Sequence, residues 1–121
     1  MSTAAQNSSL GAYGERVAAR LLTEQGMVVI DRNWRCPEGE VDLVLRDGTT
    51  LVVCEVKTRS SADYGHPLEA VTPEKANRLR RLALRWLEHH DVRPSGLRID
   101  LVGVLRNGRG AADVQHVRGI G

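Results

Sequence analysis

Two apolar segments joined by a short turn constrain the fold of this chain more than any other feature. The segments "EVDLVLR" (40–46) and "LVVCEVKTR" (51–59) are separated by "DGTT" (47–50), and Asp-Gly between two β-rich segments is a strong hairpin signal. Apart from a few charged residues, their central positions are apolar on both faces of a strand. Such a hairpin needs cover on both sides, so we predict that it lies in the middle of a sheet between helices.

The rest of the chain alternates between helical and β patterns. "GAYGERVAARLLTEQ" (11–25) is rich in helix formers and ends at Gly26, while the segment 73–91 has Thr72 as N-cap and Pro73 as its first helical residue. β-Branched residues and the positions of Pro and Gly predict the remaining elements: strands at 27–35, 97–105 and 112–117, turns at 36–39 and 106–111, and a loop at 60–72. The predicted order is α-β-β-β-α-β-β, which defines an α/β protein.

Length and composition indicate one ordinary globular domain. The chain has 121 residues, of which 26% are charged and 41% apolar, so it can enclose one core and is neither disordered nor fibrous. The polar segment 1–10 is expected to be a flexible leader and residues 11–121 a single domain. We find no signal-peptide pattern and no apolar run long enough for a bilayer, so we expect a cytoplasmic protein that does not enter the membrane. Cys36 and Cys54 fit neither a disulfide framework nor a zinc spacing, and we expect buried thiols.

An unusual set of charged residues lies within the predicted hairpin. Alternate residues of a strand share a face, so Glu55 and Lys57 point to the same side. Two registers fit the turn. If the loop comprises residues 47–50, Asp42 lies directly opposite Glu55; if the loop is shorter by two residues, Asp42 opposes Val53 and remains a diagonal neighbour of Glu55. Either register brings two carboxylates and one ammonium group together.

Two carboxylates side by side in a half-buried sheet are costly, because like charge and desolvation both penalise the ionised forms. Lys57 can compensate one charge, and a hard divalent cation, Mg²⁺ or Mn²⁺, can compensate the other. Such a cation can acidify a water molecule and stabilise charge on a phosphodiester oxygen, and Lys57 can hold the water or the oxyanion. The alternative is a structural ion pair at a sheet edge. The apolar flanks of Glu55 and the acid at Asp42 favour the metal site.

Two further acids lie in apolar surroundings. Glu15 precedes Ala19 by four residues and Leu22 by seven, which places it at the border of the buried arc of the first predicted helix, where it can face inward. Asp100 stands alone in "LRIDLVGV". Asp100 is expected either to pair with an arginine or to contact the metal ligands without binding the metal itself.

These charged positions and several longer motifs resemble known families. Asp42 and Glu55-x-Lys57 on a hairpin, with Glu15 on the preceding helix, resemble the PD-(D/E)XK (restriction endonuclease-like) nuclease superfamily. Val41 stands where the proline of the superfamily motif would be, a position that holds no ligand. Further motifs, spread over roughly residues 11–120, resemble the YraN-like family of uncharacterised bacterial proteins: "GERVAARLLTEQG", "RNWRC", "GEVDLV", "VVCEVKTR", "YGHPLEAVTPEK" and "RIDLVGV".

The resemblance implies a restriction endonuclease-like αβββαβ core, with a central mixed sheet flanked by helices, and a metal-dependent endonuclease activity. It assigns Mg²⁺ or Mn²⁺ to Asp42 and Glu55, with the carbonyl of Val56 as a further ligand. It gives Lys57 a catalytic role and places an additional catalytic acid at Glu15. Two alternatives remain: a non-catalytic nucleic-acid-binding module on a nuclease scaffold, and a partner-binding protein without nucleic acid. Retention of all four charged positions favours the hydrolase.

The second predicted helix carries cations along one flank. Lys75, Arg78 and Arg85 run beside its apolar stripe, where they are expected to contact the phosphates of a nucleic acid, with DNA as the first expectation. Tyr64, in the preceding loop, is expected to touch the substrate. Solvated arginines and a packed loop tyrosine are the alternatives. A homodimer is a further expectation, because two-armed DNA substrates often demand one.

Overall fold

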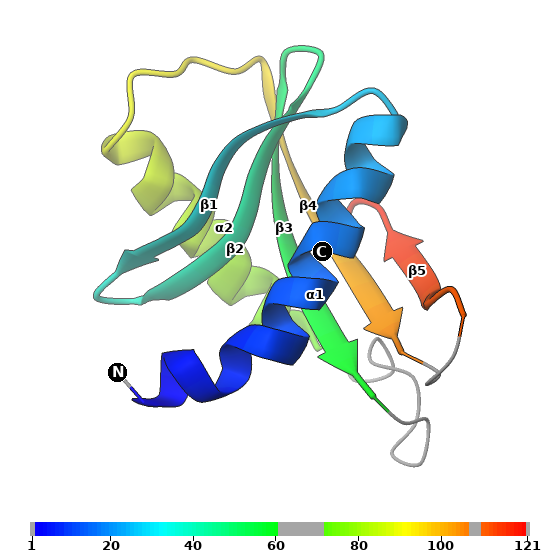
Figure 1. Cartoon of the computed structure of the whole chain (residues 1–121). Coiled ribbons are helices and arrows are strands. Elements are labelled where there is room, and N and C mark those ends of the chain that lie inside the picture. Colours follow the sequence, from blue (N-terminus) through cyan, green and yellow to red (C-terminus); the bar gives the residue numbers. More distant parts are fainter. Residues whose placement is uncertain (1, 61–71, 107–109, 121) are drawn as a thin grey trace.

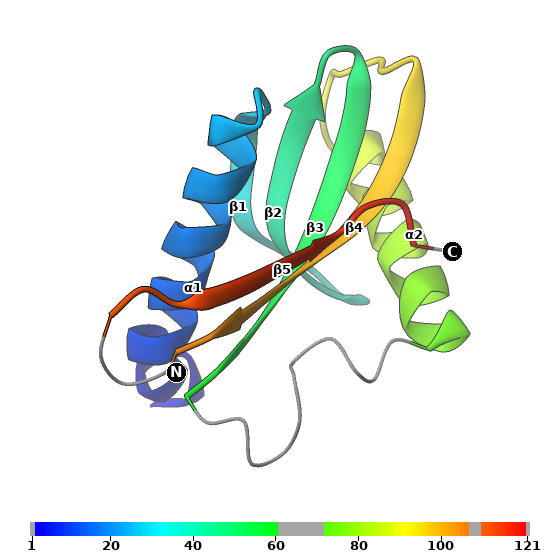
Figure 2. The ribbon, with the colours of Figure 1, turned by 90° about the vertical axis from the view of Figure 1, so that its right-hand side faces the viewer.

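The chain forms one five-stranded sheet with a helix on each face (Figures 1 and 2). The computed structural model describes residues 2–60, 72–106 and 110–120. The elements follow one another as α1 (Ser2–Glu24), β1 (Val28–Cys36), β2 (Gly39–Asp47), β3 (Thr50–Arg59), α2 (Pro73–Glu88), β4 (Gly96–Leu105) and β5 (Asp113–Val117). This order confirms the predicted α/β class and the αβββαβ core, to which β5 adds a final strand.

The sheet is mixed and follows the order of the sequence, β1-β2-β3-β4-β5. β3 and β4 are parallel, with α2 in the connection between them, whereas the other neighbouring pairs are antiparallel. Figure 2 shows the sheet between α1 on one side and α2 on the other. The predicted central hairpin is therefore covered on both faces, as its apolar composition requires.

Helix α1 begins earlier than the sequence pattern predicts. It starts at Ser2 instead of residue 11, so residues 2–10, expected to form a flexible leader, belong to the helix in the structure. The composition of residues 1–10 gives no helix signal of its own, which is why the prediction missed this part. Once the packed part of α1 has formed, each residue added at its end gains a hydrogen bond without a second nucleation step.

The register of the central hairpin is the first of the two predicted alternatives. Arg46 pairs with Leu51, and the pairing continues to Asp47 and Thr50, so the turn is shorter than the four residues expected with that register. Gly48 lies in this turn with a φ of 62°, a left-handed conformation that glycine adopts at low cost. In this register the position of Asp42 corresponds to Glu55.

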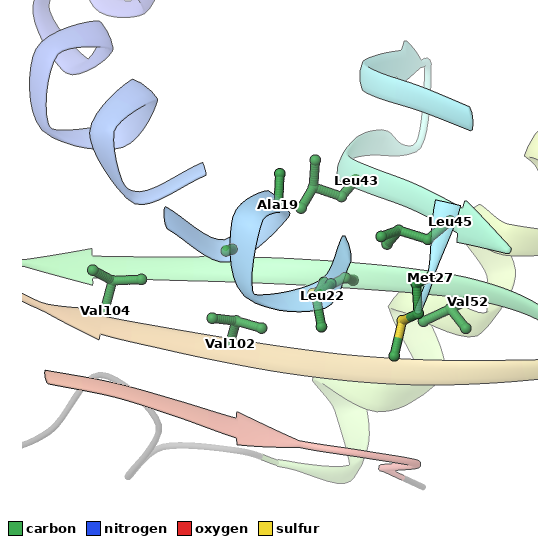
Figure 3. Packing of buried hydrophobic residues seen from close by; sticks show 10 residues of the cluster. Ala19, Leu22, Met27, Leu43, Leu45, Val52, Val102 and Val104 are labelled. Carbon is green, nitrogen blue, oxygen red and sulfur yellow. The ribbon is translucent and has the colours of Figure 1, made fainter. Parts of the chain in front are cut away.

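The core has two layers, one on each face of the sheet. The layer beneath α1 is shown in Figure 3 and contains Ala19, Leu22, Met27, Leu43, Leu45, Val52, Val102 and Val104. The layer beneath α2 contains Val41, Val44, Leu51, Val53, Leu79, Leu82, Ala83, Trp86, Ile99 and Leu101. Each layer places branched side chains of the sheet against one helix, which fixes both helices relative to β2 and β3.

A local signal explains the start of α2. The hydroxyl of Thr72 accepts a hydrogen bond from the backbone N–H of Lys75 at 3.2 Å, which confirms the predicted N-cap. Both cysteines are free; Cys54 is buried, as predicted, and Cys36 is only partly so. In the part of the chain that the structure describes, neither helix combines the length and the apolar character needed to cross a membrane.

Candidate metal and nucleic-acid site

The candidate site forms where β1 and β2 bend. Leu43 packs beneath α1 and Val41 beneath α2, although these residues would share a face in a regular strand. The alternation of side chains therefore breaks at Asp42. The sequence prediction assumed regular alternation, which would place Asp42 on the same face as Val44. The register places Asn33 opposite Asp42, and Asn33 has a φ of 51°. Asn tolerates this left-handed conformation better than most residues, so the irregular backbone of β1 lies opposite the break in alternation of β2.

The bend directs the carboxylate of Asp42 to the backbone of β3. A regular ladder that continued the Leu43–Cys54 pair would join Val56 to Val41. Instead, the N–H of Val56 donates to Asp42 Oδ2 at 2.8 Å. The N–H and C=O of a strand residue point toward the same neighbouring strand, so the carbonyl of Val56 also faces β2. The backbone oxygen that the resemblance assigns to the metal thus points to the side where Asp42 lies.

Asp42 lies among other acids. Burial raises the pKa of Asp42 from 3.8 to about 7; the Val56 N–H opposes this rise, and the charges of Glu15, Glu55 and Glu40 add to it. These acids come from α1, β3 and β2, so the bend collects negative charge from three elements. A carboxylate in this setting is held near the midpoint of its titration at neutral pH, and a bound cation would favour its ionised form.

Helix α1 brings Glu15 to the same bend. With its amide nitrogen turned toward Glu15, Asn33 donates to the two carboxylate oxygens at 3.1 and 3.2 Å. Burial raises the pKa of Glu15, Asn33 lowers it, and the charge of Glu40 raises it further. The preceding residue, Gly14, is buried against β3, where an added Cβ would lie 2.9 Å from the Cβ of Thr58. The missing side chain of Gly14 lets α1 approach β3 closely enough to place Glu15.

Glu55 is buried, with 8% of its surface exposed, and each of its two carboxylate oxygens contacts a positively charged side chain. Lys57 Nζ lies 3.5 Å from Oε2, which is the predicted acid–base pair. Arg78 Nη2 of α2 lies 3.2 Å from Oε1. The sequence predicted that Arg78 would face phosphate, whereas in the structure its guanidinium binds this carboxylate.

The donors at the bend fit a hard cation that brings part of its own coordination shell. Within residues 2–60, 72–106 and 110–120, no three His, Cys, Asp or Glu side chains lie close enough together to hold a metal ion by themselves. Magnesium-type ions, however, commonly bind one or two carboxylates and complete their shell with water and substrate phosphates. Asp42, Glu55 and the carbonyl of Val56 are oxygen donors of this kind, so these residues could hold Mg²⁺ or Mn²⁺.

A second buried acid has a different environment. Asp100 of β4 is fully buried and accepts two hydrogen bonds from Arg98, at 2.9 and 3.0 Å. His116 Nε2 lies 2.8 Å from Oδ2, and the N–H of Gly119 donates to Oδ1 at 3.1 Å. Burial raises the pKa of Asp100, but these partners outweigh burial and hold the pKa below its ordinary value. Of the two expectations for Asp100, the arginine partner is the one that the structure shows.

Comparison with known proteins identifies the family. The family described as "Uncharacterised protein family UPF0102" matches residues 14–104, which include every candidate site residue at the bend. The chain belongs to UPF0102. This confirms the resemblance to the YraN-like family, which is the same family. A UPF0102 protein of Nocardioides sp. is 63% identical over 118 residues, which cover 98% of this chain and 95% of the relative.

Other UPF0102 relatives match over almost their whole length. A UPF0102 protein of Beutenbergia cavernae is 62% identical over 113 residues, covering 93% of this chain and 96% of the relative. A UPF0102 protein of Streptomyces coelicolor is 59% identical over 114 residues, covering 93% of this chain and 88% of the relative. These similarities establish the family and carry no statement of activity.

The cations predicted on α2 of this UPF0102 protein have different surroundings. Arg85 donates to Glu38 and to Glu88, each at 2.8 Å, so its charge is compensated by two carboxylates. Lys75 is half-buried in the first turn of α2. Tyr64 lies outside the described residues. The predicted phosphate contacts of these residues stay predictions.

Sequence reasoning missed two residues of the site. Glu40 raises the pKa of Asp42, and its position two residues before Asp42 on the same strand was an available signal. Asn33 holds Glu15, but nothing in the sequence distinguishes Asn33 from an ordinary surface residue. Its role depends on the bend, which no local pattern predicts.

Proposed function

We propose that this UPF0102 protein is a metal-dependent nucleic-acid phosphodiester hydrolase of the endonuclease type, with Mg²⁺ or Mn²⁺ as cofactor. One observation carries the proposal: the carboxylate of Asp42 accepts a hydrogen bond from the backbone N–H of Val56, close to Glu55 and Lys57, and burial together with the neighbouring acids raises its pKa to about 7. Strongly perturbed pKa values cluster at functional sites.

The order of elements supports the same proposal. Asp42 lies on β2, Glu55 and Lys57 on β3, and Glu15 on α1, within an αβββαβ core. This arrangement resembles the PD-(D/E)XK superfamily, in which acids at corresponding places hold a divalent cation. The resemblance supports a reaction class and leaves the substrate open.

The chain's own residues divide the work as follows. Asp42, Glu55 and the carbonyl of Val56 hold the cation, which when bound would polarise the scissile phosphate and lower the pKa of a water molecule. The ammonium group of Lys57, 3.5 Å from Glu55, donates to the attacking water or to the developing oxyanion. Glu15 serves as a further ligand or as the base that accepts a proton from that water.

The substrate surface is formed by α2. Lys75 and Arg78 both lie on α2, and Arg78 contacts Glu55. Phosphates bound to these two side chains would therefore lie beside the proposed metal. Tyr64 and Arg85 remain candidates for contacts farther along the strand. DNA is the proposed substrate, and a homodimer would serve a two-armed one. Binding through phosphates should weaken steeply as salt is raised.

A non-catalytic nucleic-acid-binding module is the second candidate function. The observation in its favour is that both oxygens of Glu55 are already compensated, by Lys57 at 3.5 Å and Arg78 at 3.2 Å. A module of this kind would bind DNA through α2 and would not need a metal.

Incubation with nucleic acids tests both candidates. Duplex, single-stranded, flap and four-way DNA, together with RNA, are incubated with Mg²⁺, Mn²⁺ or EDTA, with Glu55→Ala and Lys57→Ala in parallel. Metal-dependent cleavage that both substitutions abolish supports the hydrolase. Salt-sensitive binding without cleavage supports the module. Cleavage that survives both substitutions comes from a contaminant and removes the support for the site.

A further inference from the structure

Glu55 has no uncompensated oxygen in the structure. Its Oε2 faces Lys57 Nζ at 3.5 Å and its Oε1 faces Arg78 Nη2 at 3.2 Å. Glu55 is 8% exposed, whereas the side chains of Lys57 and Arg78 are 44% and 41% exposed. A divalent cation that binds Asp42 and Glu55 together therefore competes with these two side chains for the oxygens of Glu55.

The two cations reach Glu55 from different elements. Lys57 lies two residues from Glu55 on the same strand, and 44% of its side chain is exposed. Arg78 reaches Glu55 from α2, across the space between helix and sheet, and 41% of its side chain is exposed. A half-exposed arginine can exchange a carboxylate for solvent or for another anion at small cost.

We propose that Arg78 is a positioning residue that occupies the metal-binding oxygen of Glu55 until a phosphodiester group of the substrate binds it. This inference rests on the proposed function and goes beyond it by linking two ligands. The guanidinium group matches the oxygens of a phosphate better than those of a single, already paired carboxylate. Substrate phosphate withdraws Arg78 from Oε1, and the released oxygen completes the cation site.

The surroundings of Arg78 allow this movement. A Cβ added at Gly39, the first residue of β2, would lie 3.7 Å from Arg78 Nη1. The guanidinium thus lies beside a residue that has no side chain to hold it. The guanidinium of Arg78 contacts Glu55, and loss of that contact leaves it able to turn toward a bound strand.

The exchange makes metal and nucleic acid bind cooperatively. If phosphate frees Glu55 for the cation, the cation must in turn strengthen phosphate binding by the same factor. A protein of this design binds its cation weakly when free and more tightly on its substrate. Such coupling would restrict hydrolysis to the complex with nucleic acid.

Manganese binding without nucleic acid tests the release step. Mn²⁺ is titrated calorimetrically into the wild type, Arg78→Gln and Arg81→Gln, the last being an exposed arginine on the same helix that controls for the loss of one positive charge. Arg78→Gln should bind Mn²⁺ about 5-fold more tightly than the wild type, the low end of typical coupling between sites, whereas Arg81→Gln should stay close to the wild type. Should Arg78→Gln fail to fold, Arg78→Lys, which replaces the guanidinium contact to Oε1 by an ammonium group on a shorter side chain, takes its place with the same expected direction.

Binding of a nuclease-resistant phosphorothioate duplex, followed by fluorescence anisotropy with and without Mn²⁺, tests the coupling. Mn²⁺ should strengthen binding to the wild type and Arg81→Gln, and should have a smaller effect on Arg78→Gln. Equal Mn²⁺ affinities in all proteins would overturn the role of Arg78 and leave the metal site intact. Absence of Mn²⁺ binding in every protein, including the Arg78 variants, would overturn both the metal site and the exchange.

Discussion

Asp42 and Asp100 are two acids of the same sheet with different surroundings: Asp100 is fully buried and Asp42 is partly buried. Arg98, His116 and the N–H of Gly119 surround Asp100, and together they outweigh burial and hold its pKa below the ordinary value. Burial raises the pKa of Asp42 to about 7, and the hydrogen bond from the backbone N–H of Val56 opposes this rise. The charge of Asp100 is thus compensated by its hydrogen-bond partners, whereas that of Asp42 is not.

The number of hydrogen-bond partners and the direction of the pKa shift separate structural from functional acids better than the residue type does. Removal of a buried carboxylate that has a complete set of donors leaves those donors unpaired, which is strongly destabilising. A carboxylate among like charges costs stability, and natural proteins keep such groups mostly where chemistry needs them. Substitution of each acid by its isosteric amide should therefore have opposite consequences.

The largest expected effect is on the stability of the Asp100→Asn variant. Removal of the charge leaves Arg98 without its main partner, and we expect a loss of about 4 kcal/mol, as for other broken buried ion pairs. Asp42→Asn should cost nothing at pH 8 and can stabilise the fold, since the amide oxygen still accepts from Val56 and the repulsion is gone. Urea unfolding of both variants measures the difference. Equal losses would show that the two acids have the same role.

The second effect is the pH dependence of stability in the absence of metal. The folded state raises the pKa of Asp42 from 3.8 to about 7, so the folded chain binds a proton more tightly than the unfolded chain. The resulting stability is present below pH 4 and is lost as the pH rises to about 7. The loss should be on the order of 3 kcal/mol, allowing for the partial exposure of Asp42.

Urea unfolding in EDTA at a series of pH values tests this decline. Asp42→Asn should remove most of it, while Asp100, with its lowered pKa, contributes a loss of stability only as the pH falls below its ordinary range. A wild-type profile that is flat between pH 4 and 7 would contradict the raised pKa of Asp42.

The third effect tests the contribution of α1 to the acid field. In Gly14→Ala, the added methyl group would lie 2.9 Å from Thr58 Cβ, so α1 must move away from β3. We expect a loss of about 2 kcal/mol from overpacking and a smaller rise in the pKa of Asp42, because Glu15 moves with the helix. Thermal unfolding and the pH profile measure both. Gly11→Ala is the matched control, because nothing lies within 4 Å of its added Cβ.

Local patterns were enough for the fold and for most of the acids. The hairpin, α2 with its Thr72 cap and the order of the elements follow from β-branched segments, turns and caps, and the structure confirms them. The acids were found because charge is rare in an apolar strand. What regular alternation could not predict is the bend at Asn33 and Asp42, since a break in a pattern leaves no periodic signal.

Contacts between distant segments account for the rest. Arg78 contacts Glu55 only because α2 crosses the sheet at one particular place, and a helical pattern gives the exposed flank without the partner. Ser2–Leu10 have too little helical character to be predicted as part of α1 by themselves. In both cases the information lies in the packing of elements, which sequence spacing does not contain.

The smallest expected effect is stabilisation by the metal, and it separates the two acids most directly. Mn²⁺ at ten times its dissociation constant should stabilise the wild type by about 1.4 kcal/mol, because it binds the folded state alone. Asp100→Asn should keep this gain, because the wild-type Asp100 carboxylate already has its donors and does not bind the metal. Asp42→Asn should lose the gain. Glu24→Gln removes an exposed carboxylate of α1 and controls for net charge. Thermal unfolding with and without Mn²⁺ measures all four proteins; if Asp42→Asn gains as much as the wild type, the acid field at the bend is not a cation site.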